Sequence, residues 1–407
     1  MRKWFLTALV VALAGCGTAD SGRDTVTLWM YPVIEDRTRS EEFWRDVETG
    51  FEARYGVDLE VELQPWRSRE EKLGAALMSR SGPDVVLLQP DMIPQYVAQG
   101  ALQPVGDVVT GAERAFRPSA LAAVTVGDQA YGVPLYQTVT TTVYNRKLFA
   151  EAGITELPRT WDEVRAAAPK LAARGVPVLD YSGSTESTLN LTFYPLLWQA
   201  GGTVFSADGT KSAFDSPQGI EALRFLVDLE NAGGLPDGAA TKGSGPANEP
   251  VVTGRAAMAH AATAAQARAV IAGVGEQDTV IGAPLRGRVQ ATFGMPGAVT
   301  LLRAAKNPDA ARHLLTYLAS PRVTEELCAR SGYFQPWTTA TSAPADAVSR
   351  TFTEALPFAN AGDTHPRARK VMSLLAPHLQ AALLGRATPE QALAEAAREV
   401  DAMLGRG

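Results

Sequence analysis

The stretch that decides the fold is GDQAYGVPLYQTVTTTVYNRKLFAEAG, residues 127–153. Pro134 disfavours helix at Val133, so a short extended segment is predicted there. Residues 138–144 are almost all β-branched and favour a strand, and a helix is expected to begin near Leu148. Taken alone, this pattern predicts one strand–turn–helix unit of an α/β protein.

The same stretch also carries a family resemblance. Its segments YGVP (131–134) and YNRKLFAEAG (144–153), followed by PRTWDE (158–163), closely resemble the extracellular solute-binding proteins of ABC-type importers, in the carbohydrate-type, maltose-binding-like branch. The resemblance covers nearly the whole mature chain. It implies a two-lobed α/β periplasmic-binding-protein fold of type II, in which each lobe is a mainly parallel sheet flanked by helices. It further implies three hinge crossings, the first of them in this stretch.

Length and composition agree with two lobes and narrow the possible functions. A chain of 407 residues exceeds what one hydrophobic core usually serves, and 46% hydrophobic with 20% charged residues is globular. The net charge is −6, and removing residues 1–15, which hold Arg2 and Lys3, leaves 36 basic and 44 acidic residues, or −8. No run of five or more basic residues occurs, which argues against nucleic acid as a partner.

The N-terminus predicts a lipid anchor. The positively charged residues Arg2 and Lys3 are followed by an apolar run, residues 4–13, that is too short to span a bilayer. Leu13-Ala14-Gly15-Cys16 then looks like a bacterial lipobox. That resemblance implies a lipoprotein signal peptide at 1–15, lipidation of Cys16 and a tether at 16–24. The protein would then sit on the outer face of the cytoplasmic membrane, anchored stably by two or more acyl chains. The alternative is an ordinary signal peptide with a chance cysteine.

The order of elements predicts how the chain is divided. Strands are expected at 25–31, 57–63 and 85–88, with a helix capped by Ser40 after the first, and this βαβαβ order implies parallel neighbours. By resemblance, the second and third crossings are expected at residues 293–297 and 332–337. Lobe 1 is therefore predicted to comprise residues 25–135 plus 293–335, and lobe 2 residues 136–292 plus 336–407.

Binding residues are predicted from the strand ends and the crossings. In open α/β sheets the ligand lies beyond the carboxyl ends of the strands. Sugars pack their C–H faces on aromatic rings and take hydrogen bonds from planar polar groups. The candidates are Tyr31, Asp36, Trp66, Gln89, Asp91, Tyr136, Gln137, Trp198, Phe293, Met295, Phe334 and Trp337. Helix capping or a surface charge remains an alternative for the two aspartates, and rim packing for Trp66. Packing without ligand contact also remains open for Trp198 and for the apolar residues at the crossings.

The sequence carries no signature of catalysis or of a cofactor. The four histidines lack metal-ligand spacing, and Cys328, unpaired once Cys16 is lipidated, excludes an internal disulfide and a cysteine-based metal site. No nucleophile elbow, phosphate-binding loop or dinucleotide motif is present. We therefore expect no metal, no cofactor and no enzymatic activity.

The predicted function is that of a monomeric ABC-importer lipoprotein. By resemblance it captures a sugar or oligosaccharide between its lobes and delivers it to permease subunits and their ATPase. Two alternatives stay open at this point. One is a binding protein for a polyol phosphate or another small solute, with Arg67 and Arg69 as the only phosphate-binding candidates near the rim. The other is a secreted glycoside hydrolase that uses an Asp/Glu pair.

Overall fold

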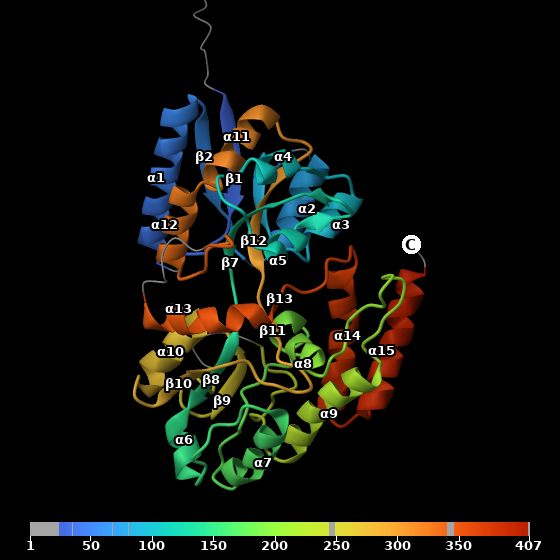
Figure 1. Cartoon of the computed structure of the whole chain (residues 1–407). Coiled ribbons are helices and arrows are strands. Elements are labelled where there is room, and N and C mark those ends of the chain that lie inside the picture. Colours follow the sequence, from blue (N-terminus) through green and yellow to red (C-terminus); the bar gives the residue numbers. More distant parts are fainter. Residues whose placement is uncertain are drawn as a thin grey trace, which may run out of the picture.

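The computed structural model describes residues 24–34, 36–66, 68–79, 81–243, 249–339 and 346–405. The predicted signal peptide and Cys16 lie outside these residues. The chain forms two lobes, one above the other in Figure 1, connected by extended segments that run between them. No helix within the described ranges is long and apolar enough to cross a membrane.

Lobe 1 is built around a six-stranded mixed sheet. Its strand order is β2-β1-β3-β12-β4, with β7 also paired to β12. The strands are β1 (Thr25–Met30), β2 (Asp58–Leu63), β3 (Val85–Leu88), β4 (Leu102–Gln103), β7 (Val133–Gln137) and β12 (Pro296–Leu302). The strands β2 and β3 both run parallel to β1, as the βαβαβ order predicts. Their carboxyl ends therefore point towards lobe 2.

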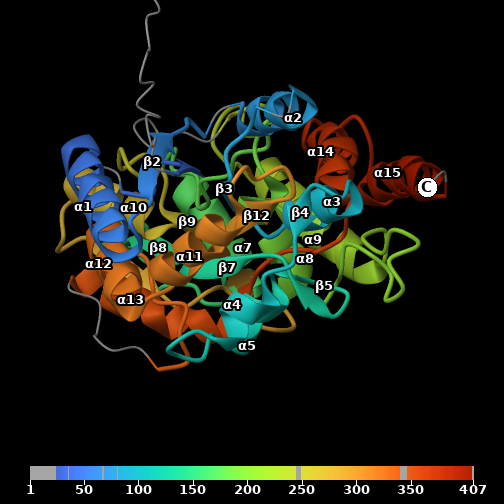
Figure 2. The ribbon, with the colours of Figure 1, turned by 90° about the horizontal axis from the view of Figure 1, so that it is seen from above.

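Helices cover both faces of this sheet (Figure 2). They are α1 (Arg37–Tyr55), α2 (Arg69–Ser79), α3 (Ile93–Ala98), α4 (Gly106–Thr110), α5 (Pro118–Ala122), α11 (Pro308–Leu318) and α12 (Pro321–Ser331). Lobe 1 also contains a small hairpin formed by β5 (Thr125–Val126) and β6 (Gln129–Ala130). Helix α1 buries the apolar stripe Phe43, Trp44, Val47 and Phe51.

The start of α1 differs from the prediction. Asp36, not Ser40, is the N-cap, and its carboxylate accepts a hydrogen bond from the backbone N–H of Arg39 at 2.8 Å. The helix begins one turn earlier than predicted because an aspartate ahead of the first turn satisfies one of its free N–H groups. Ser40 is instead buried within the helix.

Lobe 2 is built around a smaller, three-stranded sheet. The order is β10 (Thr279–Gly282), β8 (Thr141–Asn145) and β9 (Met258–Ala262), and both pairs are antiparallel. Its helices are α6 (Arg146–Glu151), α7 (Trp161–Ala172), α8 (Tyr194–Gln199), α9 (Pro217–Asn231), α10 (Ala264–Val274), α13 (Ala347–Phe352), α14 (Ala368–Leu383) and α15 (Pro389–Leu404), with the 3-10 turns η1 (Leu189–Leu191) and η2 (Thr353–Phe358). The last two long helices pack against each other and against α9 (Figure 1).

The two-lobed α/β architecture is confirmed, but the expectation of mainly parallel sheets is wrong. In lobe 1, β12 pairs antiparallel with β3, β4 and β7. The reason is chain direction: β1 and β3 run towards lobe 2, whereas β12 enters from lobe 2 and runs away from it. In lobe 2, β8 leads away from the crossings, and β9 and β10 return towards them, so their pairing with β8 is antiparallel.

The first two crossings lie side by side. The N–H groups of Thr138 and Thr140 donate to the carbonyl oxygens of Met295 and Phe293, each at 2.8 Å. The strand predicted at 138–144 therefore begins later, at Thr141, because residues 138–140 form the crossing; β7 belongs to lobe 1 and β8 to lobe 2. Glycine is required at position 294, because a Cβ there would lie 2.6 Å from the Thr138 oxygen.

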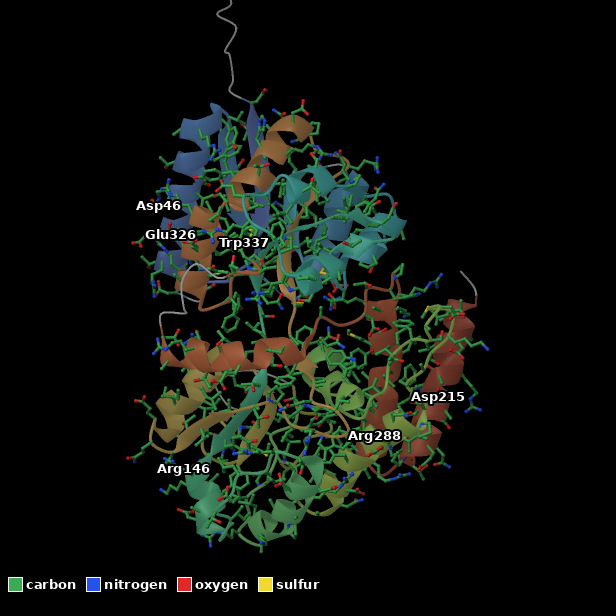
Figure 3. The ribbon with its side chains drawn as sticks, viewed as in Figure 1. Asp46, Arg146, Asp215, Arg288, Glu326 and Trp337 are labelled. Atoms are coloured by element: carbon green, nitrogen blue, oxygen red, sulfur yellow. The ribbon has the colours of Figure 1, made fainter. Side chains whose placement is uncertain are left out.

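The third connecting segment touches the same hinge. Gln137 and Phe334 exchange two backbone hydrogen bonds, at 2.7 and 2.9 Å. The chain then returns to lobe 1, where the N–H of Thr338 donates to the Ala115 oxygen at 2.9 Å. Trp337, which the sequence analysis assigns to lobe 2, therefore packs in lobe 1 (Figure 3), and the chain reaches α13 of lobe 2 beyond it.

Candidate functional site

A cavity of about 820 Å³ lies between the two lobes. Lobe 1 contributes residues from the β2–α2 connection and the end of β3, and lobe 2 contributes η1, the start of α10 and the start of α14. The crossings line it between the lobes. The principal lining residues are Trp66, Arg69, Glu70, Gln89, Tyr136, Thr138, Ser187, Asn190, Thr263, Phe293, Met295, Tyr333, Phe334, Arg369 and Met372.

Trp66 provides an aromatic wall on the lobe 1 side. Its ring stacks on the buried ring of Tyr31, with centroids 4.8 Å apart and planes 20° from parallel. Its indole N–H donates to the Pro32 carbonyl oxygen at 3.2 Å, and the Arg69 guanidinium lies over the ring at 5.6 Å. These contacts hold a half-buried indole in one orientation, which suits it for stacking against a ligand.

The crossings provide a second aromatic surface. Tyr136 and Tyr333 stack with centroids 4.9 Å apart, and Phe293, Met295 and Phe334 lie alongside them in the cavity lining. Burial raises the pKa of Tyr136 well above its usual value, and the neighbouring Tyr333 raises it further. The phenol is therefore neutral at any physiological pH and acts only as an apolar or hydrogen-bonding group.

A charged cluster joins the two lobes at one end of the cavity. Arg369 of α14 lies 3.4 Å from the Glu70 carboxylate and 3.5 Å from that of Asp91, both in lobe 1. Gln89 accepts hydrogen bonds from both Arg69 and Arg369, at 2.7 and 3.1 Å. Burial raises the pKa of Asp91, although the two arginines act to lower it. Burial, followed by the like charge of Arg369, lowers the pKa of Arg69.

The lobe 2 wall is polar and partly unsatisfied. The Ser187 hydroxyl and the Asn190 side-chain oxygen are buried and make no hydrogen bond among the described residues. Buried polar atoms without partners are costly, so water or a ligand is expected to pair with them. Thr263 and Ala264 reach the cavity because β9 ends beside the crossings.

Six predicted site residues come together at this cavity: Trp66, Gln89, Tyr136, Phe293, Met295 and Phe334. The other six do not line it. Tyr31 supports Trp66 from behind, Asp36 caps α1, and Asp91 pairs with Arg369. Gln137 is buried in the hinge, where its amide N–H donates to the Thr138 oxygen at 2.9 Å.

The remaining two tryptophans belong to the lobe cores. Trp198 is buried in α8 within the lobe 2 core. Trp337 is fully buried, stacks on Phe116 at 4.3 Å, and donates from its indole N–H to the Thr324 hydroxyl at 3.2 Å. Neither ring faces the cavity, because each satisfies its packing within its own lobe.

The sequence predicts only part of the lobe 2 wall. The polar segment 181–190 is typical of a cleft loop, and its residues Ser187 and Asn190 line the cavity. Arg369 and Met372 follow no strand end and carry no motif, and only the folding of α14 against the crossings brings them to the cavity. Arg69 was considered only as a phosphate ligand, and Arg67 lies outside the described residues. No cluster of three or more metal-ligating side chains occurs in the described part of the chain.

A second, smaller cavity of about 280 Å³ lies within lobe 2 and contains His260. The ring is 3% exposed, and its Nε2 donates to the Thr192 carbonyl oxygen at 2.9 Å. Burial lowers the pKa of His260 to about 4, so the folded protein holds it neutral. This histidine therefore makes stability depend on pH.

We expect the free energy of unfolding to fall by about 2 kcal/mol between pH 7 and pH 4.5 through His260 alone. Below its usual pKa of 6.5 the unfolded chain binds a proton that the folded protein excludes until about pH 4, so acid favours unfolding. Urea denaturation of the wild type and of His260→Gln across this range measures the effect. The glutamine variant should lose that part of the pH dependence; an equal dependence in both proteins would contradict the assignment.

Two α/β lobes joined by adjacent crossings, with a mixed aromatic and polar cavity between them, define the class of type II periplasmic binding proteins. The chain belongs to the bacterial extracellular solute-binding protein family, whose family model matches residues 31–325. The recognition made from residues 127–163 is thereby confirmed.

Three individual similarities extend over different shares of the chain. A binding protein of Brucella abortus is 24% identical over 99% of both chains. The diacetylchitobiose-binding protein of Streptomyces coelicolor is 27% identical over 39% of each chain. An ABC transporter solute-binding protein of Thermotoga lettingae, solved with α-D-tagatose, is 26% identical with a TM-score of 0.79, covering 94% of this chain and 100% of its own.

Proposed function

We propose that this protein binds a neutral sugar or oligosaccharide in the cavity between its lobes and delivers it to an ABC-type permease. The observation that carries the proposal is the composition of the cavity wall: Trp66 is fixed on Tyr31 on one side, and hydrogen-bonding groups without partners, such as those of Ser187 and Asn190, lie on the other. This combination suits a ligand with apolar ring faces and many hydroxyl groups. The diacetylchitobiose and tagatose bound by two of its relatives are of this kind.

The proposed mechanism is hinge closure. The lobes are connected through the crossings at residues 137–140, 293–296 and 334. Changes in a few backbone torsions at these crossings would be enough to rotate one lobe relative to the other. A ligand that contacts Trp66 from lobe 1 and Asn190 from lobe 2 makes all its contacts only when the lobes approach. It therefore binds the closed state more tightly and shifts the population towards it.

The charges of the cavity favour a neutral ligand over a polyol phosphate. Arg69 and Arg369 already contact Gln89, and Arg369 also lies beside Glu70 and Asp91. The lining includes Glu71 as a further acid. A phosphate would have to displace these contacts and approach the carboxylates, which costs Coulomb energy.

The family and the N-terminal sequence support a proposal for the cellular role. We infer that Cys16 is lipidated, that the monomer is held at the outer face of the cytoplasmic membrane, and that permease subunits and their ATPase are its partners. In this role the protein performs no chemistry on its ligand. The alternative, glycoside hydrolysis, would require two carboxylates placed across the scissile bond. The lining holds Glu70 beside Arg369, together with Glu71 and Glu186, so a product assay distinguishes this alternative.

A thermal-shift screen with a product assay tests this function. Maltose, maltotriose, diacetylchitobiose, tagatose and glycerol phosphate are the ligands to compare. At 100 times its Kd, a ligand adds about 2.7 kcal/mol to the free energy of unfolding, so a clear rise in Tm is expected for at least one sugar. Chromatography should show that sugar unchanged. A response to glycerol phosphate alone, or the appearance of hydrolysis products, would overturn the proposal.

A further inference from the structure

The side chain of Gln89 is held by both lobes at once. Its Oε1 accepts one hydrogen bond from Nη2 of Arg69, at 2.7 Å, and another from Nη2 of Arg369, at 3.1 Å. Arg69 belongs to α2 of lobe 1, and Arg369 to α14 of lobe 2. Two guanidinium groups, which can only donate, therefore converge from opposite lobes on one amide oxygen.

This arrangement determines which end of the amide faces the ligand. A carbonyl oxygen has two lone pairs, and both are used by the arginines. The reverse orientation would direct the amide N–H groups at two cations, so the hydrogen-bond network selects the orientation observed. Gln89 lines the cavity, and its Nε2 makes no hydrogen bond to any residue that the structure describes. Two N–H donors are thus left for a ligand.

Both arginines are themselves anchored. Arg69 also donates to the Trp66 carbonyl oxygen at 3.3 Å. Arg369 is flanked by the carboxylates of Glu70 and Asp91 at 3.4 and 3.5 Å, and its side chain is only 19% exposed. Arg369, which lobe 2 contributes, contacts Gln89 only when the lobes are as close as in this structure. Closure and the orientation of Gln89 are therefore linked.

We propose that Gln89 is a specificity-determining residue that Arg69 and Arg369 orient as an obligate hydrogen-bond donor towards the ligand. The group it recognises is an uncharged acceptor oxygen, such as a hydroxyl, ring or carbonyl oxygen of a sugar. Arg369 acts as a positioning residue, because it reaches Gln89 only from lobe 2 and thereby couples lobe closure to recognition. This inference rests on the proposed function for the identity of the ligand, but its orientation part concerns the ligand-free protein.

The first experiment needs no ligand. Gln89→Glu keeps an acceptor for both arginines and adds a charge, whereas Gln89→Met removes the acceptor with little change in volume. We expect the ligand-free Tm of Gln89→Glu to equal or exceed that of the wild type, and that of Gln89→Met to fall by about 1–3 °C. Gln129→Glu, at an exposed position of the same lobe outside the cavity lining, controls for the added charge. The reverse order of Tm for the two Gln89 variants would overturn the orientation.

The second experiment measures binding by calorimetry, with maltotriose and diacetylchitobiose as probes. Gln89→Glu turns both donors into an acceptor, so affinity should fall at least 10-fold although the fold is not weakened. Arg369→Ala should also weaken binding several-fold, while Arg367→Ala, whose guanidinium donates within lobe 2 to the Met403 oxygen, should not. Full affinity in Gln89→Glu would overturn the donor role. Failure of the wild type to bind any sugar would instead count against the proposed function, and the ligand-free order of Tm would still decide the orientation.

Discussion

Replacing Trp66 with alanine is expected to weaken binding of the sugar found in the screen about 30- to 100-fold. The ring lines the cavity, is half-buried, and is held in place by Tyr31, the Pro32 oxygen and Arg69. A preorganised aromatic surface of this kind contributes about 2–3 kcal/mol when it is covered by a ligand. Isothermal calorimetry of the wild type and Trp66→Ala measures the loss directly.

Two further variants separate stacking from other causes. Trp66→Phe keeps a ring and should lose less than 10-fold, although it removes the hydrogen bond to Pro32. The ligand-free Tm of Trp66→Ala should change little, because the side chain lies at the edge of the lobe 1 core. Unchanged affinity in Trp66→Ala would remove this residue from the site.

Replacing Trp337 with alanine should act on stability and not on recognition. The side chain is fully buried in lobe 1, stacks on Phe116 and donates to Thr324. Truncating a buried tryptophan leaves a large cavity and an unpaired hydroxyl acceptor, so a loss of about 3–5 kcal/mol is expected. Urea denaturation, monitored through a spectroscopic signal that arises in lobe 1, measures this loss in the free energy of unfolding.

The control for this variant is the binding of its folded fraction. At urea concentrations below the variant's denaturation midpoint, the affinity of Trp337→Ala for the sugar should lie within about twofold of the wild-type affinity, because the ring does not line the cavity. Trp337→Phe, which keeps most of the packing, should recover more than half of the lost stability. A 10-fold loss of affinity without loss of stability would place this ring at the ligand instead.

Predicted residues line the cavity where local sequence determines their position. Trp66 and Gln89 follow strands β2 and β3, and parallel neighbours place such positions on one rim of a sheet. Tyr136, Phe293 and Phe334 lie in the crossings that the resemblance indicated. Trp66 and Gln89 reach the cavity because the strands before them can be recognised from β-branched and apolar runs, whereas the crossing residues were indicated by the family resemblance.

The prediction was less informative where an aromatic residue could serve either a core or a cavity. Trp66 and Trp337 both lie beside extended segments, yet Trp66 lines the cavity between the lobes and Trp337 is enclosed by Phe116 and Thr324. The difference arises from which distant elements cover each ring. Burial is a property of the whole fold, and no spacing within a single segment encodes it.

The amino-acid sequence by itself determined the α/β class, most strands and helix starts, and the aromatic and amide side chains that follow the strands of lobe 1; the crossings came from the family resemblance. Each of these depends on near neighbours in the chain: β-branched runs, capping side chains and the residues that follow a strand. Only the tertiary structure decided the antiparallel pairing of β12, the place of Trp337, and the convergence of Arg69 and Arg369 on Gln89. The physical reason is that these features depend on segments distant in the chain, such as Arg369 and Gln89, which are 280 residues apart, so their geometry exists only after the chain has folded.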